Sequence, residues 1–190
     1  MLKLKENKRL FVMPNIEMRP FTLNDAFAYY ELYNHSSVKK YIPEDMIPKD
    51  LKASAEQISS LFLQNRAIPY WAIVDAQTDQ LVGTCGFVGS DFYHKRLEIA
   101  YDLHPNFWGR GIMFNSLKVC IKYAFERMSM QRLEAVTLRE NVESAKVLLR
   151  LGFVHEGTLR SFKFFRGKMR NVESFSFVFE DYKKIFGKNV

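Results

Sequence analysis

Residues 97–127 read LEIAYDLHPNFWGRGIMFNSLKVCIKYAFER, and this stretch decides how the rest of the chain is interpreted. Leu97 to Leu103 alternates apolar and polar residues, which predicts a strand with Glu98 on the face opposite the apolar row. Gly109-Arg110-Gly111 follows, and then an amphipathic helix. Glycines before a helix let backbone N–H groups converge on an anion, which the helix dipole and Arg110 also attract. The pattern predicts a phosphate site; a plain strand-to-helix turn stays open, because a short Gly-x-Gly motif is common.

The composition favours one globular domain. The chain has 190 residues, of which 47% are hydrophobic and 26% charged, and we expect a single domain over residues 1–190 with a core at about 11–182. No segment approaches the roughly 20 apolar residues that span a bilayer, and no signal peptide follows the basic Met1 to Arg9. We therefore expect a soluble cytoplasmic protein whose Cys85 and Cys120 are reduced thiols.

The remaining elements predict an α/β fold of the α+β type, with a mixed, mostly antiparallel central sheet of about seven strands flanked by helices. A capping box at Thr22 and Asp25 predicts a helix through Tyr33. The other expected elements are a first strand over 10–19 weakened by Pro14, a second helix over 51–62, a hairpin of 70–74 and 81–88, a strand over 133–138, a helix from Asn141 to Gly152, and a closing hairpin of 158–165 and 172–180, with Phe175, Phe177 and Phe179 on one face.

Several motifs in the same order resemble the GNAT superfamily of acetyl-CoA-dependent N-acetyltransferases. The family's loop, Gln/Arg-x-x-Gly-x-Gly/Ala, aligns with residues 106–111, where Asn106 replaces the usual Gln or Arg. Further matches are residues 18–21 with Asp25, Asn141 to Lys146, Leu151-Gly152-Phe153 and Glu156-Gly157. Together they resemble the Rim-type branch, which acetylates N-terminal α-amino groups of ribosomal proteins and has relatives that act on other amines.

The resemblance implies a GNAT fold with acetyl-CoA as cosubstrate in a cleft between two splayed strands, Leu97–Leu103 and Leu133–Leu138. It implies that the backbone of Leu103 pairs with the pantetheine and that the loop over Gly109, Arg110, Gly111, Ile112 and Met113 holds the pyrophosphate. Asn106 is the first residue of that loop motif. Asn141 has two compatible roles, as helix cap and as a contact to the cofactor.

Acetyl transfer requires a base, because an α-amino group has a pKa near 8 and a lysine side chain about 10.4. Glu98 is the candidate, since it lies beside the implied acetyl group and gains basicity if partly buried. The alternative is a solvated or ion-paired glutamate whose partner is Arg96 or Lys95. Both interpretations stay open.

Ser144 is the candidate for the proton that the departing thiolate needs. Many family members place a tyrosine where this chain has Leu148, and the resemblance to the Rim-type branch implies that a serine takes its place. The alternative for Ser144 is a hydroxyl that helps to cap the helix.

The sequence gives little support for a metal site, a reactive cysteine or an RNA-binding surface. The four histidines show no metal-ligand spacing, so we expect no metal, and Cys85 between two glycines of an apolar strand predicts a packed thiol. Phe162 and Phe164 beside basic residues suggest RNA binding, but alternating phenylalanines in a strand are more typical of a core. The formal charge of +7 favours a polyanionic partner such as nucleic acid, a ribosomal surface or a phosphate-rich cofactor.

The leading hypothesis is direct acetyl transfer from acetyl-CoA to a primary amine, with a protein N-terminal α-amino group as the first choice and with Glu98 and Ser144 as the catalytic residues. Its first alternative is acetylation of a small-molecule amine such as a polyamine, an antibiotic or an amino acid. Its second is a non-catalytic acyl-CoA-binding sensor module. We expect no membrane partner, allow for ribosome association, and leave the chain as a monomer or homodimer.

Overall fold

The computed structural model describes residues 9–60 and 68–187. The strands are β1 (Leu10–Met13), β2 (Ile16–Arg19), β3 (Tyr70–Asp75), β4 (Leu81–Asp91), β5 (Arg96–Leu103), β6 (Arg132–Leu138), β7 (Val154–Phe165) and β8 (Lys168–Val178). The helices are α1 (Ala26–Asn34), α2 (Ser36–Lys39), α3 (Leu51–Ile58), α4 (Ile112–Lys122), α5 (Val142–Leu151) and α6 (Phe179–Phe186). None of the helices in these two ranges is long and apolar enough to cross a membrane.

The strands form one eight-stranded sheet in the order β1-β2-β3-β4-β5-β6-β8-β7. Strands β5 and β6 run parallel, and the pairs β1–β2, β2–β3, β3–β4, β6–β8 and β7–β8 are antiparallel. The predicted mixed, mostly antiparallel sheet is confirmed. The eighth strand arises because Asn15 adopts a φ of +63°, which turns residues 10–19 into two short strands where one was expected.

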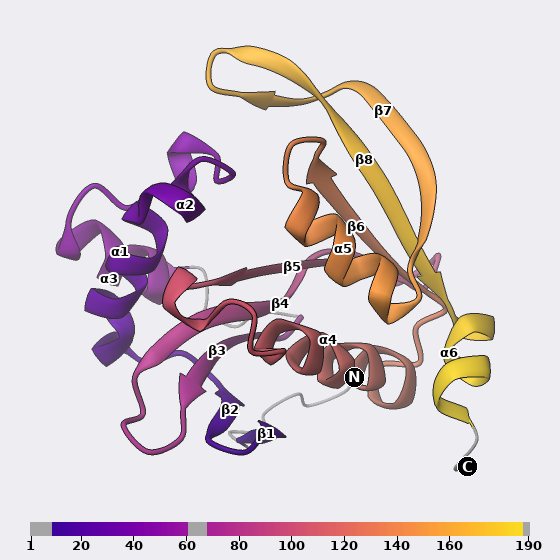
Figure 1. Ribbon diagram of the computed structural model, residues 1–190, viewed down its shortest axis with the longest axis horizontal. Coiled ribbons are helices and arrows are strands. Elements are labelled where there is room, and N and C mark those ends of the chain that lie inside the picture. Colours follow the sequence, from indigo (N-terminus) through magenta and orange to yellow (C-terminus); the bar gives the residue numbers. More distant parts are fainter. Residues whose placement is uncertain (1–8, 61–67, 188–190) are drawn as a thin grey trace. The chain divides into compact units, whose positions relative to one another are not determined.

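The residues group into two compact units, which are described separately. The first unit is Met1–Gly86 with Tyr101–Ser116, and the second is Phe87–Ala100 with Leu117–Val190. In the first unit, α1 and α3 lie side by side (Figure 1), and the Ser54 hydroxyl of α3 donates to the Ala26 carbonyl of α1 at 2.6 Å. Leu61 and Phe62, expected to continue the helix of α3, lie outside the described residues.

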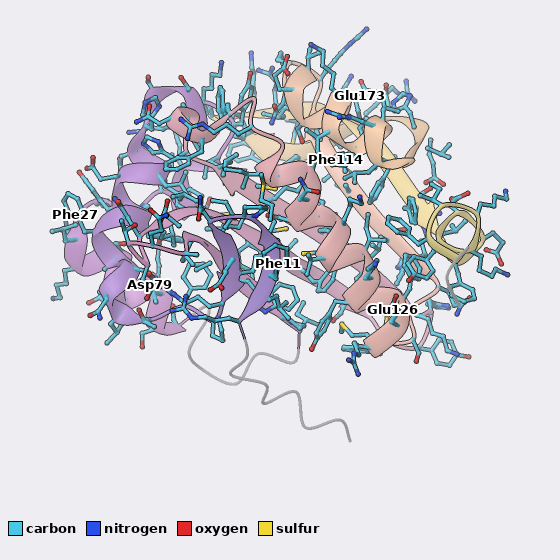
Figure 2. All side chains as sticks on the ribbon, turned by 60° about the horizontal axis from the view of Figure 1, so that its bottom comes forward. Phe11, Phe27, Asp79, Phe114, Glu126 and Glu173 are labelled. Carbon is cyan, nitrogen blue, oxygen red and sulfur yellow. The ribbon has the colours of Figure 1, made fainter. Side chains whose placement is uncertain are left out.

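A buried ion pair in the first unit fixes the start of α1. The Arg19 guanidinium donates to both oxygens of Asp25, at 2.7 and 2.8 Å, and to Asp79 at 2.9 Å. The Thr22 N–H also donates to Asp25, so the predicted capping box is present. Asp79, labelled in Figure 2, lies in the turn between β3 and β4 and takes a second bond from Arg9. The network therefore connects β2, the start of α1 and the turn between β3 and β4.

The two glycines of β4 lie where neighbouring strands approach closely. A Cβ on Gly83 would lie 2.6 Å from the carbonyl oxygen of Asp102, and one on Gly86 would lie 2.4 Å from the Cα of Tyr70. Both distances are shorter than any side chain tolerates, so these positions admit only glycine.

Two expectations for the second unit are wrong. Strand β8 ends at Val178 and α6 begins at Phe179, so Phe179 does not share the strand face of the buried Phe175 and Phe177. The cause is local, because the Asp181 carboxylate accepts the Val178 N–H at 3.1 Å and starts a helix.

The closing hairpin also differs from the prediction for its aromatic residues. Phe162 and Phe164 are 57% and 67% exposed, and it is Phe165 that is buried. The register of β7 against β8 shifts between Leu159 and Lys163, where Ser161 has a φ of +48°. Four residues of β7 here span two residues of β8, and in this irregular stretch Phe162 and Phe164 face outward.

Candidate functional site

The glycine loop of the first unit is built to leave backbone groups accessible. Gly109 and Gly111 have φ values of +74° and +73°, a region that other residues rarely adopt. A Cβ on Gly109 would meet no atom within 4 Å, so the space beside it is open. Helix α4 begins directly after the loop, and the first N–H groups of a helix have no partner within it. Open space beside free helix-end N–H groups fits a phosphate group.

Two side chains that the motif does not reveal hold this loop. The Asn115 side chain donates to the Gly111 carbonyl at 2.9 Å, and the Trp108 indole donates to the Leu103 carbonyl at 2.7 Å. Arg110 is exposed, with its guanidinium 5.2 Å from the Phe107 ring centroid. The Leu103 carbonyl, expected to pair with the pantetheine, thus already accepts one bond and keeps a second lone pair.

The side chains of the other residues predicted for this loop are exposed to different extents. Asn106 is exposed, and its backbone N–H donates to the His104 ring at 3.3 Å. Ile112 and Met113 are 3% and 8% exposed, so their side chains belong to the core. Only their backbone groups are available to a ligand, and the bulk of Met113 therefore does not enter the loop.

In the second unit, Glu98 is a half-buried carboxylate without a partner. Among the residues that the structure describes, no donor forms a hydrogen bond or an ion pair with it. Burial raises the pKa of Glu98 above its usual range, the charge of Lys163 lowers this pKa, and Glu134 raises it. A Cβ on Gly89 would lie 3.4 Å from Oε2 of Glu98, so this glycine gives the carboxylate its space.

The ion pair suggested as the alternative for Glu98 is formed by another carboxylate. Arg96 pairs with Asp91 at 3.4 Å and with Glu134 at 3.6 Å. Glu134 stands opposite Glu98 in the parallel register of β5 and β6, and Arg132 binds it at 2.8 Å. Of these two neighbouring glutamates, Glu134 pairs with two arginines, whereas Glu98 forms no ion pair among the described residues.

Helix α5 begins as predicted. The Asn141 side chain accepts the Ser144 N–H at 3.4 Å, and Gly152 ends the helix in the left-handed region with a φ of +98°. Ser144 is the third residue of α5 and is half-buried. Ser144 contributes its backbone N–H group to this capping bond, so the bond does not require the Ser144 hydroxyl. Lys146 pairs with Glu143 at 2.8 Å.

A buried hydroxyl cluster in the first unit escaped the sequence analysis. The Tyr33 hydroxyl donates to Asp102 at 2.9 Å, and the hydroxyls of Tyr33 and Tyr70 each lie 3.2 Å from that of Thr84. Burial raises the pKa of both tyrosines well above the usual value, with Asp102 adding to the effect. The two tyrosines therefore stay protonated, and Tyr33 donates its proton to the hydrogen bond with Asp102. Residues from α1, β3, β4 and β5 meet here, and no local pattern predicts such a meeting.

Metal and thiol chemistry find no site in the described part of the chain. Across residues 9–60 and 68–187, no three His, Cys, Asp or Glu side chains gather as a metal site would require. Cys85 and Cys120 are both buried and form no disulfide, in agreement with the packed role expected for Cys85.

The chain matches known acetyltransferases over most of its length. The family model described as "Acetyltransferase (GNAT) domain" matches residues 15–154. The uncharacterized N-acetyltransferase p20 of Bacillus licheniformis is 31% identical over 171 residues, covering 88% of this chain and 94% of the relative. The spermidine N(1)-acetyltransferase of Escherichia coli (strain K12) is 22% identical over 157 residues, covering 83% and 82%.

A solved structure supports the same assignment of fold. The ribosomal-protein-S5-alanine acetyltransferase of Vibrio fischeri superposes with a TM-score of 0.79 at 22% identity, covering 91% of this chain and 98% of that one. Together with the matched stretch 15–154 and the p20 relative, this settles the family. The chain belongs to the GNAT family and is an N-acetyltransferase.

Proposed function

We propose that this enzyme acetylates the α-amino group of a protein N-terminus, by direct attack of the amine, with Glu98 as general base and Ser144 as general acid. The observation that carries the proposal is the unpaired, half-buried Glu98 beside a fully paired Glu134. Glu98 forms no ion pair among the described residues, and burial raises its pKa, which brings this pKa nearer to that of the proton it must take.

The acid strength of the acceptor favours an α-amino group. Its pKa near 8 lies about 2.5 units below that of a lysine-type amine, which corresponds to about 3.4 kcal/mol. At neutral pH the α-amine is therefore a few hundred-fold richer in the neutral nucleophile. A single carboxylate base is therefore matched better to this acceptor than to a polyamine.

The cosubstrate of the family is acetyl-CoA, which supplies the activated acetyl group. We assign its pyrophosphate to the loop from Gly109 to Met113, with Arg110 and Asn106 beside it and the Leu103 carbonyl available to the pantetheine. Support comes from the positive φ values, the open space at Gly109 and the exposed Arg110. Asn141 and Ser144 belong to the start of α5, where the Ser144 hydroxyl would return a proton to the leaving sulfur.

Two finer expectations remain part of the proposal. We place the reaction in the cytoplasm, where buried thiols such as Cys85 and Cys120 stay reduced. Association with the ribosome remains a prediction, supported by the basic net charge of +7 and by the likeness to an acetyltransferase named for a ribosomal protein.

A small-molecule amine is the second candidate, and the spermidine acetyltransferase among the relatives is the observation that favours it. A thiol-release assay with three acceptors decides between the two. The acceptors are a peptide with a free N-terminus, the same peptide with a blocked N-terminus and one lysine, and spermidine. We expect CoA release with the first and at least tenfold less with the others; a clear preference for spermidine overturns the proposal.

Ser144 is tested with Ser144→Ala against Ser144→Thr, which restores a hydroxyl. We expect the alanine variant to lose about tenfold in kcat, because a proton to the thiolate then comes from water, and the threonine variant to recover part of it. If both variants keep full rate and differ only in melting temperature, Ser144 is a capping residue.

A further inference from the structure

The far end of the β7–β8 hairpin concentrates positive charge. Residues 159–170 read LRSFKFFRGKMR and contain five basic and no acidic residues, namely Arg160, Lys163, Arg166, Lys168 and Arg170. Strand β6 pairs with β8 only as far as Leu138 opposite Val172. This end of the β7–β8 hairpin therefore continues beyond the end of β6 (Figure 1). We call residues 159–171 the basic arm.

One cation of the basic arm acts electrostatically on Glu98. Lys163 is close enough for its charge to lower the pKa of Glu98, and it stands opposite Arg170 in the register of β7 and β8. Both side chains are half-buried. An acceptor amine placed at Glu98 is therefore near positive charge from β7 and β8.

A hollow of about 340 Å³ lies along the arm, lined by Arg139, Glu140, Lys168, Met169, Arg170 and Asn171. Glu140 pairs with Arg170. Arg139 and Lys168 form no ion pair with any carboxylate of the described residues, so the hollow keeps a net positive charge. Its volume is that of a site for a few side chains.

The arm also exposes apolar surface. Phe162, Phe164 and Met169 are 57%, 67% and 49% exposed, and Phe164 stands opposite Met169 across the hairpin. Exposed aromatic surface beside cations suits a polypeptide with both apolar and acidic side chains. A free polyamine offers neither feature, and its second and third charges would be repelled.

Resting on the proposed function, we infer that the preferred acceptor is a polypeptide whose residues just after the reactive N-terminus are acidic, bound by Arg139, Lys163, Lys168 and Arg170. Single pairs of charges at the surface are weak, so two or three such pairs together change KM by roughly tenfold. Such pairs weaken as salt is added, because screening acts on exposed charges.

The test uses three peptides of equal length with the same first residue, carrying Asp and Glu, Asn and Gln, or Lys at the next positions. We expect the acidic peptide to have a KM about tenfold below that of the amide peptide at low salt, and the advantage to shrink at 0.3 M salt. Lys168→Glu and Arg139→Glu should each raise KM for the acidic peptide by several-fold and lower it for the lysine peptide. Lys184→Glu, an exposed lysine of α6, is the matched control and should change neither.

Three results would overturn the inference. Equal KM values for acidic and amide peptides show that charge after the N-terminus is not recognised, while the proposed function stands. Loss of single-stranded RNA binding in the Glu variants, with KM for peptides unchanged, assigns the arm to nucleic acid. Acetylation of spermidine and of no peptide overturns both the inference and the proposed function.

Discussion

Two buried or half-buried carboxylates, Asp25 and Glu98, stand in opposite environments. Asp25 is 3% exposed and receives two bonds from Arg19 and one from the Thr22 N–H. Glu98 is half-buried and has no such partner among the described residues, although Arg96 lies two positions before it in the same strand. Arg96 pairs with Asp91 and Glu134.

The difference separates structural from chemical carboxylates. A buried carboxylate with a complete set of partners stabilises the fold only as long as every partner remains. A carboxylate whose neighbours are already paired elsewhere costs stability when ionised, and it keeps the lone pairs that proton transfer needs. The contrast predicts that removing the partner of Asp25 lowers stability, whereas mutating Glu98 lowers activity.

The largest effect is expected for Arg19→Met, which leaves Asp25 buried without its cation. Breaking a buried pair in this way costs about 3–5 kcal/mol of unfolding free energy, measured by denaturant unfolding at pH 7.5. Arg9→Met is the control, because Arg9 also binds Asp79 but is exposed, and it should cost under about 1 kcal/mol. Similar losses for both variants would contradict the structural role assigned to the Arg19–Asp25 pair.

Glu98→Gln should show the reverse pattern. We expect kcat to fall by about 100-fold, the usual range for a general base, without a loss of stability. Because the folded-state pKa of Glu98 is raised, its ionised form disfavours folding at neutral pH, and removing the charge relieves this. Stopped-flow or thiol-release kinetics and thermal unfolding on the same samples check both parts; near-normal turnover removes Glu98 from the mechanism.

The pH dependence of kcat/KM gives a smaller but more specific test. The base must be ionised, so the rate falls as pH drops through the pKa of Glu98, which lies above the usual 4.5. Glu134→Gln removes a neighbouring negative charge, so the acid limb should move to lower pH. Lys163→Met removes a positive charge, and the limb should move to higher pH. Shifts in the same direction for both variants would show that the limb does not belong to Glu98.

Local signals predicted much of the fold and of the candidate site. The alternation of Leu97–Leu103, the two glycines before α4, the Asn141 cap and the Gly152 stop each depend on a few consecutive residues, and the structure has them all. These features arise from backbone preferences and side-chain-to-backbone bonds that act within one turn or strand.

What escaped prediction depends on contacts between distant segments. Arg96 could have paired with Glu98 by proximity in sequence, but the register of β5 and β6 brings Glu134 within its reach. No sequence pattern in β4 indicates that Gly89 lies against Glu98. The bulge at Ser161 likewise follows from pairing with β8, and it exposes Phe162 and Phe164. Strand register is a tertiary property, so single-sequence periodicity does not determine it.

The smallest predicted effect concerns the space around the unpaired carboxylate. In Gly89→Ala the added methyl lies 3.4 Å from Oε2 of Glu98, where it displaces water and strengthens the burial that raises the pKa of Glu98. We expect the acid limb of kcat/KM to move to higher pH, a loss of activity below tenfold at pH 6 and little change at pH 8. Glu98→Gln combined with Gly89→Ala should show no such limb, whereas a limb that persists in the double variant would assign it to another group.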